Sequence, residues 1–354
     1  MELHLAALHR KMVTENVEMA IYIVEGLLIV ITNLPVAVVI FFSSKFKSAR
    51  EFTFIGGLCL ANVIYGLAYV AAGAVRTHMH VSGQDKDLNM IFECSWLPWM
   101  FLSLVGYQST ALITLLISTD RFLAVYFPTW HLNIMTQRKK TVILGVIFVL
   151  ILCTAPLIWF VESNSTEAAR QMFSAECYVS KGLTSQLWSY LLSFRIVIIT
   201  SSCIVYIPVA WKIREIKRKN SSGHKSQLSK HRKLVHLTVT IALSTTMSLF
   251  LLVIPDILFL FNFGNVGSEY HFVLYLIPLN SCVVTVLLYN MRHRELRRAL
   301  VVAVFSFLGR TETKVSSGKR VLFNTATEFP LRTCSKVRSV RSAPYESTIK
   351  KMRK

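Results

Sequence analysis

The strongest constraint on the fold is a series of seven apolar stretches, each long enough to cross a lipid bilayer as a helix. A helix needs about 20 apolar residues to cross a hydrocarbon core of roughly 30 Å. Hydrophobic residues make up 53% of the chain and charged residues 16%, which excludes an ordinary soluble globular protein. The connecting segments lack the alternating pattern of barrel strands, so we predict an all-α membrane protein. The predicted spans are Glu18–Phe42, Phe52–Val75, Trp96–Thr119, Thr141–Val161, Ser185–Ala210, Leu234–Phe261 and Tyr270–Tyr289.

The basic residues predict how the bundle crosses the membrane. Most of the 39 Lys and Arg residues follow spans one, three, five and seven, which places those segments in the cytoplasm and the amino terminus outside. The net charge of +20 then faces anionic lipids of the inner leaflet rather than nucleic acid. We expect an extracellular amino terminus (1–17), a seven-helix domain (18–300), and a basic, disordered cytoplasmic tail (301–354) that is open to kinases.

The third span ends in the charged pair Asp120-Arg121, followed by Phe122. Ionisable residues at the end of a membrane helix are costly without partners, and they indicate function. With Val125 and Pro128 at fixed offsets, this stretch resembles the third helix and second cytoplasmic loop of rhodopsin-like G-protein-coupled receptors. The resemblance implies that Asp120 restrains Arg121 at rest and that Arg121 meets a heterotrimeric G protein when span six swings outward. Residues 231–236 offer Arg121 no acid as a second resting partner.

Other spans carry variants of receptor motifs. Asn33 and Asn62 resemble buried polar positions of the first two helices, and they serve either as packing contacts between helices or as parts of a switch. Asn62 stands where the family usually has an acid, and a neutral amide is a poorer ligand for sodium. Pro255 should kink span six, because it removes a backbone donor. Tyr206 in span five and Asn280 in span seven complete the expected switch residues.

Span seven departs from the family pattern in its middle, and it is followed by a basic amphipathic stretch up to Leu300. We expect this stretch to form a short helix lying on the inner leaflet. The altered motifs in spans two, six and seven put the usual activation relay of the family in question.

Cys94 and Cys177 are two of 7 cysteines, and both fall on the predicted outer, oxidising side. The resemblance implies a disulfide between them. Cys94 lies about half a helical turn further from Asp120 than is usual, so a bulge or a longer loop should absorb the difference. Asn164-Ser165-Thr166, in the same loop as Cys177, is a predicted glycosylation site.

Arg195 and Asp256 are charged residues deep within neighbouring spans, about 15 Å and about 9 Å below the predicted outer ends. A lone charge at that depth is unfavourable, so we predict that they pair across the floor of a cavity. The pair is either purely structural or in contact with a ligand. The other predicted ligand-binding residues are Ser103, Tyr107, Gln108 and Tyr190. Span three carries no acid at this depth, which argues against amine ligands.

The resemblance therefore implies a receptor that binds a small molecule or a short peptide among its helices and activates a heterotrimeric G protein. Among family branches, the chain is most similar to nematode serpentine chemoreceptors, and a neuropeptide receptor of the same fold is the alternative. A transporter or channel would show internal repeats and a path of charges, which the sequence lacks. We expect no enzymatic activity, no cofactor and no metal site. Expected partners are the ligand, the G protein, membrane lipids, and kinases and arrestin at the tail.

Overall fold

The computed structural model describes residues 2–43, 46, 51–84, 88–165, 172–174, 177–180, 182–219, 238–239, 241–262, 265 and 270–307. The predicted tail from residue 308 onward and residues 231–237 lie outside these ranges. Two predictions therefore concern residues outside the described ranges: the disordered tail, and the lack of an acidic partner for Arg121 among residues 231–236.

Within the described residues, seven helices are long and apolar enough to cross a membrane, as predicted. They are α1 (Glu2–Phe42), α3 (Thr53–Ser82), α5 (Pro98–Tyr126), α7 (Gln137–Ser163), α8 (Ser185–Lys219), the span Ile241–Phe261, and α12 (His271–Arg292). The shorter elements are β1 (Leu88–Met90), α4 (Ile91–Ser95), α6 (Pro128–Ile134), β2 (Met172–Ser174) and α13 (Arg294–Phe307).

Several helix ends differ from the predicted spans, because a helix is not bounded by the hydrocarbon core. α3 continues past Val75 to Ser82, where Gly83 adopts a left-handed conformation (φ 72°) and ends the helix. α5 begins at Pro98 rather than Trp96, since proline fits the first turn of a helix, where its missing N–H is not needed. At the amino terminus, helix α1 already begins at Glu2.

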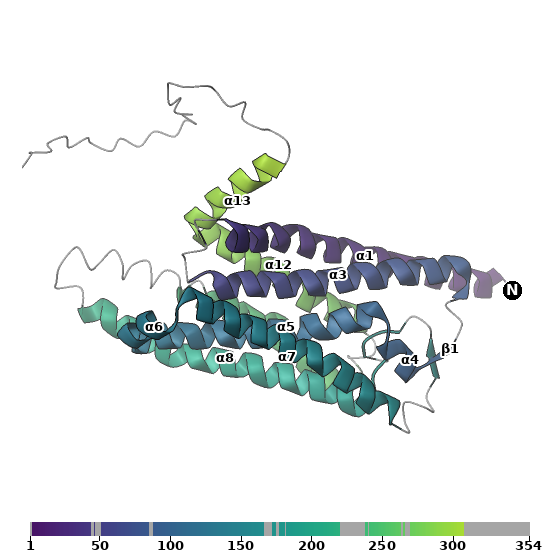
Figure 1. Cartoon of the computed structure of the whole chain (residues 1–354). Helices are drawn as coiled ribbons and strands as arrows, with labels where there is room; N and C mark the ends of the chain where they lie inside the picture. The colour runs from purple at the N-terminus through teal and green to yellow at the C-terminus, as the bar shows by residue number, and fades with distance from the viewer. Residues whose placement is uncertain are drawn as a thin grey trace, which may run out of the picture. The chain divides into compact units, whose positions relative to one another are not determined.

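The helices run side by side, with α3 packed between α1 and α5 and with α8 against α5 (Figure 1). α1 and α3 approach closely at Gly26 and Gly66, where an added Cβ on Gly26 would lie 2.7 Å from the Gly66 carbonyl oxygen. Small residues that let backbones approach are typical of membrane helix pairs. β1 and α4 lie where α1 begins, which we call the disulfide end (Figure 1). α6 lies at the opposite end, which we call the Asp120 end.

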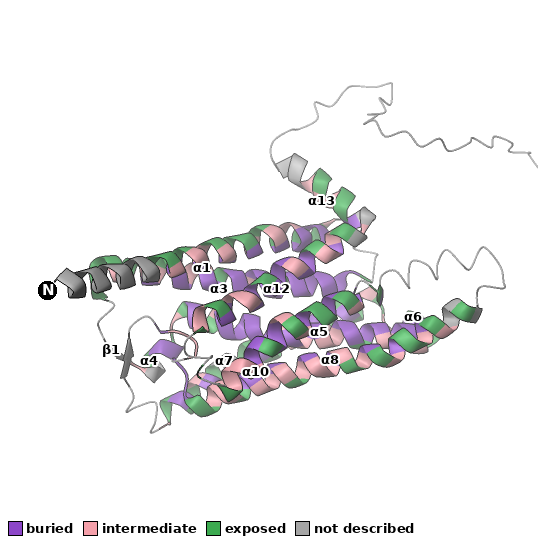
Figure 2. Cartoon of the chain, turned by 180° about the vertical axis from the view of Figure 1, so that it is seen from behind, coloured by how far each residue is buried: buried purple, intermediate pink, exposed green. Residues whose placement is uncertain are grey.

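The helix faces that meet one another are buried, whereas the outward faces are exposed (Figure 2). The buried residues include polar ones, such as Asn33, Asn62 and Ser202, and the exposed ones include many large apolar residues. Large exposed apolar residues occur on several spans, among them Ile31, Val149, Phe160, Val197 and Ile207. Such an apolar exterior is expected of a protein embedded in a lipid bilayer, because the hydrocarbon core is as apolar as these side chains.

Span six contains a π-helical segment, η3 (Leu249–Val253), directly before α10 (Ile254–Phe261). Pro255 lies at the start of α10, so the irregularity occurs where a proline kink was predicted. A π turn changes the register of the hydrogen bonds and is common at functional sites. The sequence pattern gave no sign of this wider turn.

α13 follows α12 after a single residue and packs against α12 and α1. The predicted amphipathic helix after span seven is therefore present. Its position on a membrane surface stays a prediction.

Candidate functional site

A disulfide joins Cys94 to Cys177, with the two Cα atoms 5.4 Å apart, so the predicted bond is confirmed. Cys94 lies in the separate short helix α4, and the chain turns at Trp96 and Leu97 before α5 begins. This break absorbs the extra half-turn between Cys94 and the charged pair at the other end of α5.

The segment around Cys177 covers the disulfide end of the bundle and is held by three further contacts. β2 pairs antiparallel with β1. Arg76 of α3 is buried and donates a hydrogen bond of 3.0 Å to the Cys177 carbonyl oxygen. The Ser180 backbone N–H donates to the Tyr275 hydroxyl at 3.2 Å. We call residues 177–180 the lid.

Beneath the lid lies a cavity with about 460 Å³ of empty volume, open space at its mouth included. Six of its fourteen lining residues are aromatic, and the lid contributes Val179. The lining residues are Tyr65, Tyr69, Ser103, Leu104, Tyr107, Val179, Trp188, Leu191, Arg195, Asp256, Phe259, Leu274, Tyr275 and Pro278.

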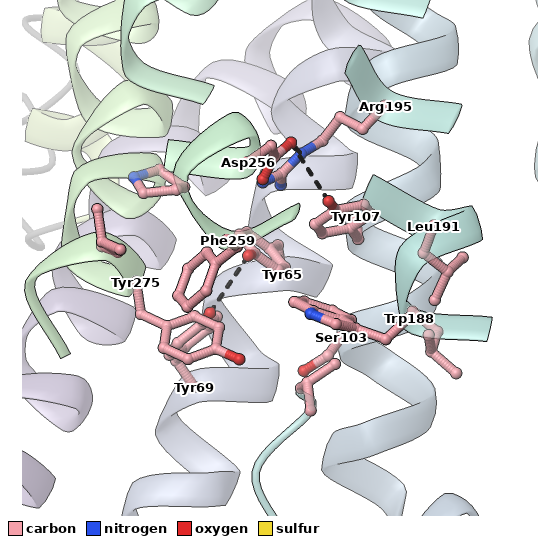
Figure 3. Close-up of a pocket in the computed structure, with 14 residues that line it drawn as sticks. Tyr65, Tyr69, Ser103, Tyr107, Trp188, Leu191, Arg195, Asp256, Phe259 and Tyr275 are labelled. Atoms are coloured by element: carbon pink, nitrogen blue, oxygen red, sulfur yellow. Dashed lines mark hydrogen bonds and ion pairs between the residues drawn. The ribbon is translucent and has the colours of Figure 1, made fainter. Parts of the chain in front are cut away.

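Arg195 and Asp256 form a buried ion pair at one end of this cavity (Figure 3). Arg195 Nε donates to Asp256 Oδ2 at 2.6 Å, and Nη2 donates to Oδ1. Tyr107 adds a hydrogen bond of 3.3 Å from its hydroxyl to Oδ2, and its ring centroid lies 3.6 Å from the guanidinium carbon. Parallel bonds from arginine to a carboxylate are a strong, geometrically specific contact. The pair predicted from the depth of both charges and from the family's arrangement of spans is therefore present, and it links α8 to α10.

Two of the predicted ligand-binding residues do not face the cavity. Gln108 is buried against α7, where its Oε1 accepts a hydrogen bond of 3.0 Å from Thr154. Adjacent helical residues point about 100° apart, so Gln108 cannot share the face of Tyr107. Tyr190 is 61% exposed on the outside of α8, and Leu191 takes its place in the wall. Ser103 and Tyr107 line the cavity as predicted.

At the Asp120 end, the carboxylate of Asp120 is surrounded by three basic side chains. Its Oδ2 accepts from Arg121, while Oδ1 lies 2.9 Å from His131 Nε2 and 2.5 Å from Lys140 Nζ. Asp120 and Arg121 are both buried. Asp120 thus holds Arg121 as predicted, and α6 and the start of α7 share the same carboxylate. We call these four residues the Asp120 cluster.

The remaining predicted switch residues fall in two groups. Tyr206 is buried on the inner face of α8, as is Arg195, and Asn62 Nδ2 donates to Asn33 Oδ1 across α1 and α3 at 3.0 Å. Asn280 is exposed and its amide bonds only to its own helix, at the Leu276 carbonyl oxygen. The neighbouring Ser281 is buried in its place, and a switch role for Asn280 stays a prediction.

Two predicted residues lie nearer the surface. Phe122 is half-buried and stacks on Tyr126, with ring centroids 4.7 Å apart. Asn164 is exposed at the end of α7, where a glycan could be attached, and glycosylation stays a prediction.

The contacts of three further charged residues that hold these sites together were not predicted from the sequence. Lys140 and Arg76 lie at the ends of predicted spans, where basic side chains usually face water. Glu162, at the end of α7, is fully buried and accepts hydrogen bonds from the backbone N–H and hydroxyl of Thr184, at 2.9 and 3.0 Å. Only their burial distinguishes these residues from ordinary interfacial charges.

Residues 32–287 match the sequence profile of the 7 transmembrane receptor (rhodopsin family). The chain belongs to this family. The match covers more than half of the sequence and includes the cavity, the disulfide and the Asp120 cluster. The receptor is accordingly a multi-pass membrane protein of a non-enzymatic family. No curated protein matches the chain closely enough to count as a relative. In the part of the receptor that the structure describes, no three His, Cys, Asp or Glu side chains gather as a metal site would require.

Proposed function

We propose that this receptor binds a small molecule in the cavity beneath the lid and activates a heterotrimeric G protein at the Asp120 end. The observation that carries the proposal is the cavity floor, where the Arg195–Asp256 ion pair joins α8 to α10. A ligand that reaches this pair acts on two spans at once. α10 also begins at the π turn, where the helix is already irregular.

The coupling half of the proposal rests on the Asp120 cluster. The positive-inside rule predicts that this end faces the cytoplasm. Arg121 is buried beside Asp120, so the structure corresponds to a restrained state of this arginine. A change in the packing of span six would open the space beside Arg121 to a G protein.

The lid favours a small molecule over a short peptide. It is fixed by the disulfide, by Arg76 and by Tyr275, and Val179 projects into the cavity wall. A peptide would have to displace these contacts, whereas a compact ligand beneath the lid would leave them in place. The similarity to nematode serpentine chemoreceptors supports a chemosensory role, so we propose odorant-like molecules as the first class to test. From the sequence of the tail we also propose kinases, arrestin and anionic lipids as partners.

The test is a screen of odorants and neuropeptides on cells that express the receptor, read by a second messenger. Cells that express Arg121→Ala at equal surface density are the matched control. We expect a small molecule to raise the signal with the natural receptor and not with the variant. An equal response from Arg121→Ala would contradict coupling through this residue, and a response to peptides alone would contradict the proposed ligand class.

A further inference from the structure

The charged side chains that line the cavity have no net charge. Among its described lining residues, Arg195 and Asp256 are the charged ones, and they neutralise each other. A ligand acid would bring a second anion next to Asp256, and a ligand amine would bring a second cation next to Arg195. Either would leave an unpaired charge in a buried, largely apolar site, which is strongly unfavourable.

The hydrogen-bonding groups of Asp256 and Arg195 are not occupied to the same extent. Asp256 accepts two hydrogen bonds from Arg195 and one from Tyr107. Arg195 has five N–H donors, of which two are spent on Asp256, and its guanidinium makes no other hydrogen bond to the described residues. An incoming group therefore finds spare donors, and it needs an acceptor to use them.

The rest of the cavity suits a flat apolar body. Figure 3 shows the ion pair and Tyr107 at one end, with the rings of Trp188, Tyr69 and Tyr275 toward the other. The hydroxyl groups of Tyr65 and Tyr69 share one hydrogen bond of 3.2 Å. These walls offer ring faces and edges and no further charge.

We infer that the ligand is an uncharged small molecule with a carbonyl-type acceptor on an aromatic or similarly flat apolar body. The carbonyl oxygen takes the spare donors of Arg195, and the body lies among the rings. This inference rests on the proposed function, because it assigns the ligand class of the same cavity.

Four probes on one scaffold separate the possibilities: methyl phenylacetate, phenylacetate, phenethylamine and propylbenzene, with the matching naphthyl series for size. Binding is measured as the concentration-dependent rise of the unfolding temperature of the full-length receptor in lipid nanodiscs. We expect the ester to bind best. The hydrocarbon should bind about tenfold more weakly, because it lacks the hydrogen bond to a charged donor. The acid and the amine should bind more weakly than the ester as well.

Two single variants should change which charge the cavity accepts. Asp256→Asn leaves Arg195 as an unpaired cation, so phenylacetate should become the preferred probe. Arg195→Gln leaves Asp256 as an unpaired anion, so phenethylamine should become preferred. The double variant Arg195→Gln/Asp256→Asn removes both buried charges and guards against misfolding of the single variants. Its preference for the ester over the hydrocarbon should be smaller than that of the natural receptor, because the remaining amide N–H groups are uncharged donors.

The matched control is Lys212→Gln/Glu215→Gln, which removes a partly exposed ion pair of 2.8 Å on the same helix α8. It should leave the order of the four probes unchanged. A contrary outcome is that the natural receptor binds the acid or the amine most tightly and loses that binding in the double variant. This result would overturn the ligand class but leave the cavity as the binding site. If no probe's binding depended on Arg195 or Asp256, the ligand class would be overturned and the proposed site with it.

Discussion

The Lys140 ammonium lies 2.5 Å from the Asp120 carboxylate, although the two residues belong to different membrane helices. Lys140 is fully buried, and its Nζ also lies 5.2 Å from the centre of the Phe54 ring. Asp120 therefore shares its carboxylate among Lys140, His131 and Arg121. The restraint on Arg121 depends on how much of that carboxylate remains available to it.

Replacing Lys140 should tighten the restraint. In Lys140→Met the carboxylate keeps Arg121 as its partner and loses a competing cation, so basal and agonist-driven G-protein activation should both fall. The free energy of unfolding should change by no more than about 1 kcal/mol, because Asp120 stays paired and a buried ion is replaced by an apolar side chain of similar length. Nucleotide exchange on a purified G protein gives the first quantity and thermal unfolding the second.

Lys139→Met is the matched control for Lys140→Met, because Lys139 is the preceding residue on α7 and is exposed. It should change neither quantity. Raised basal activity in Lys140→Met would show that Lys140 restrains the receptor rather than competing for Asp120.

Loss of the disulfide should destabilise the receptor and loosen the lid. Cys94→Ser should lower the free energy of unfolding by about 2 to 4 kcal/mol, because the bond closes a long loop in the unfolded chain. Cys177→Ser should match it, and the double variant should add nothing. Surface density and thermal unfolding report this loss, and Cys153→Ser, at an exposed free thiol, is the control. Unequal effects of the two single variants would point to a separate role for one cysteine.

The ion pair at the cavity floor should be costly to break and tolerant of joint replacement. Arg195→Ala should lower the free energy of unfolding by about 3 to 5 kcal/mol, because it leaves Asp256 buried without its cation. Arg195→Asp alone should lose expression, and the exchange Arg195→Asp/Asp256→Arg should recover folding. Surface density and unfolding temperature measure these outcomes. If the exchange variant were as unstable as Arg195→Asp, the placement of each side chain, and not the pairing of charges alone, would decide the stability.

The hydrogen bond between Asn62 and Asn33 should be measurable as a coupling between α1 and α3. Single replacements by Ala should each lower stability, and a double-mutant cycle should give a coupling of about 0.6 to 2 kcal/mol. Asn280→Ala should have little effect, because that side chain is exposed and bonds within its own helix. A large loss of stability from Asn280→Ala would contradict this expectation and indicate that its side chain makes a contact beyond its own helix.

The fold and the floor of the site could be predicted because both follow from the energy of burial. Apolar length fixes the spans, and two charges as deep as Arg195 and Asp256 have few partners other than each other. The pairing of Cys94 with Cys177 came from the family resemblance rather than from burial.

The inward face of each helix could not be predicted in the same way. Lipid is as apolar as the bundle interior, so α8 shows no polar stripe to separate Tyr190 from Leu191. The adjacent Tyr107 and Gln108 are both plausible wall residues until the helix is oriented. Lys140 was missed because it ends the basic run Arg138-Lys139-Lys140, which reads as an interfacial charge cluster.

The central claim is that Arg121, held by Asp120, is the residue through which the receptor activates a G protein. The most direct measurement is nucleotide exchange on a purified G protein by receptors in nanodiscs at matched density, without ligand. Asp120→Asn removes the carboxylate from Arg121 and should raise exchange above that of the natural receptor. Adding Arg121→Ala to the same variant should return exchange to the level of empty nanodiscs. Raised exchange that persists in the Asp120→Asn/Arg121→Ala receptor would contradict the account.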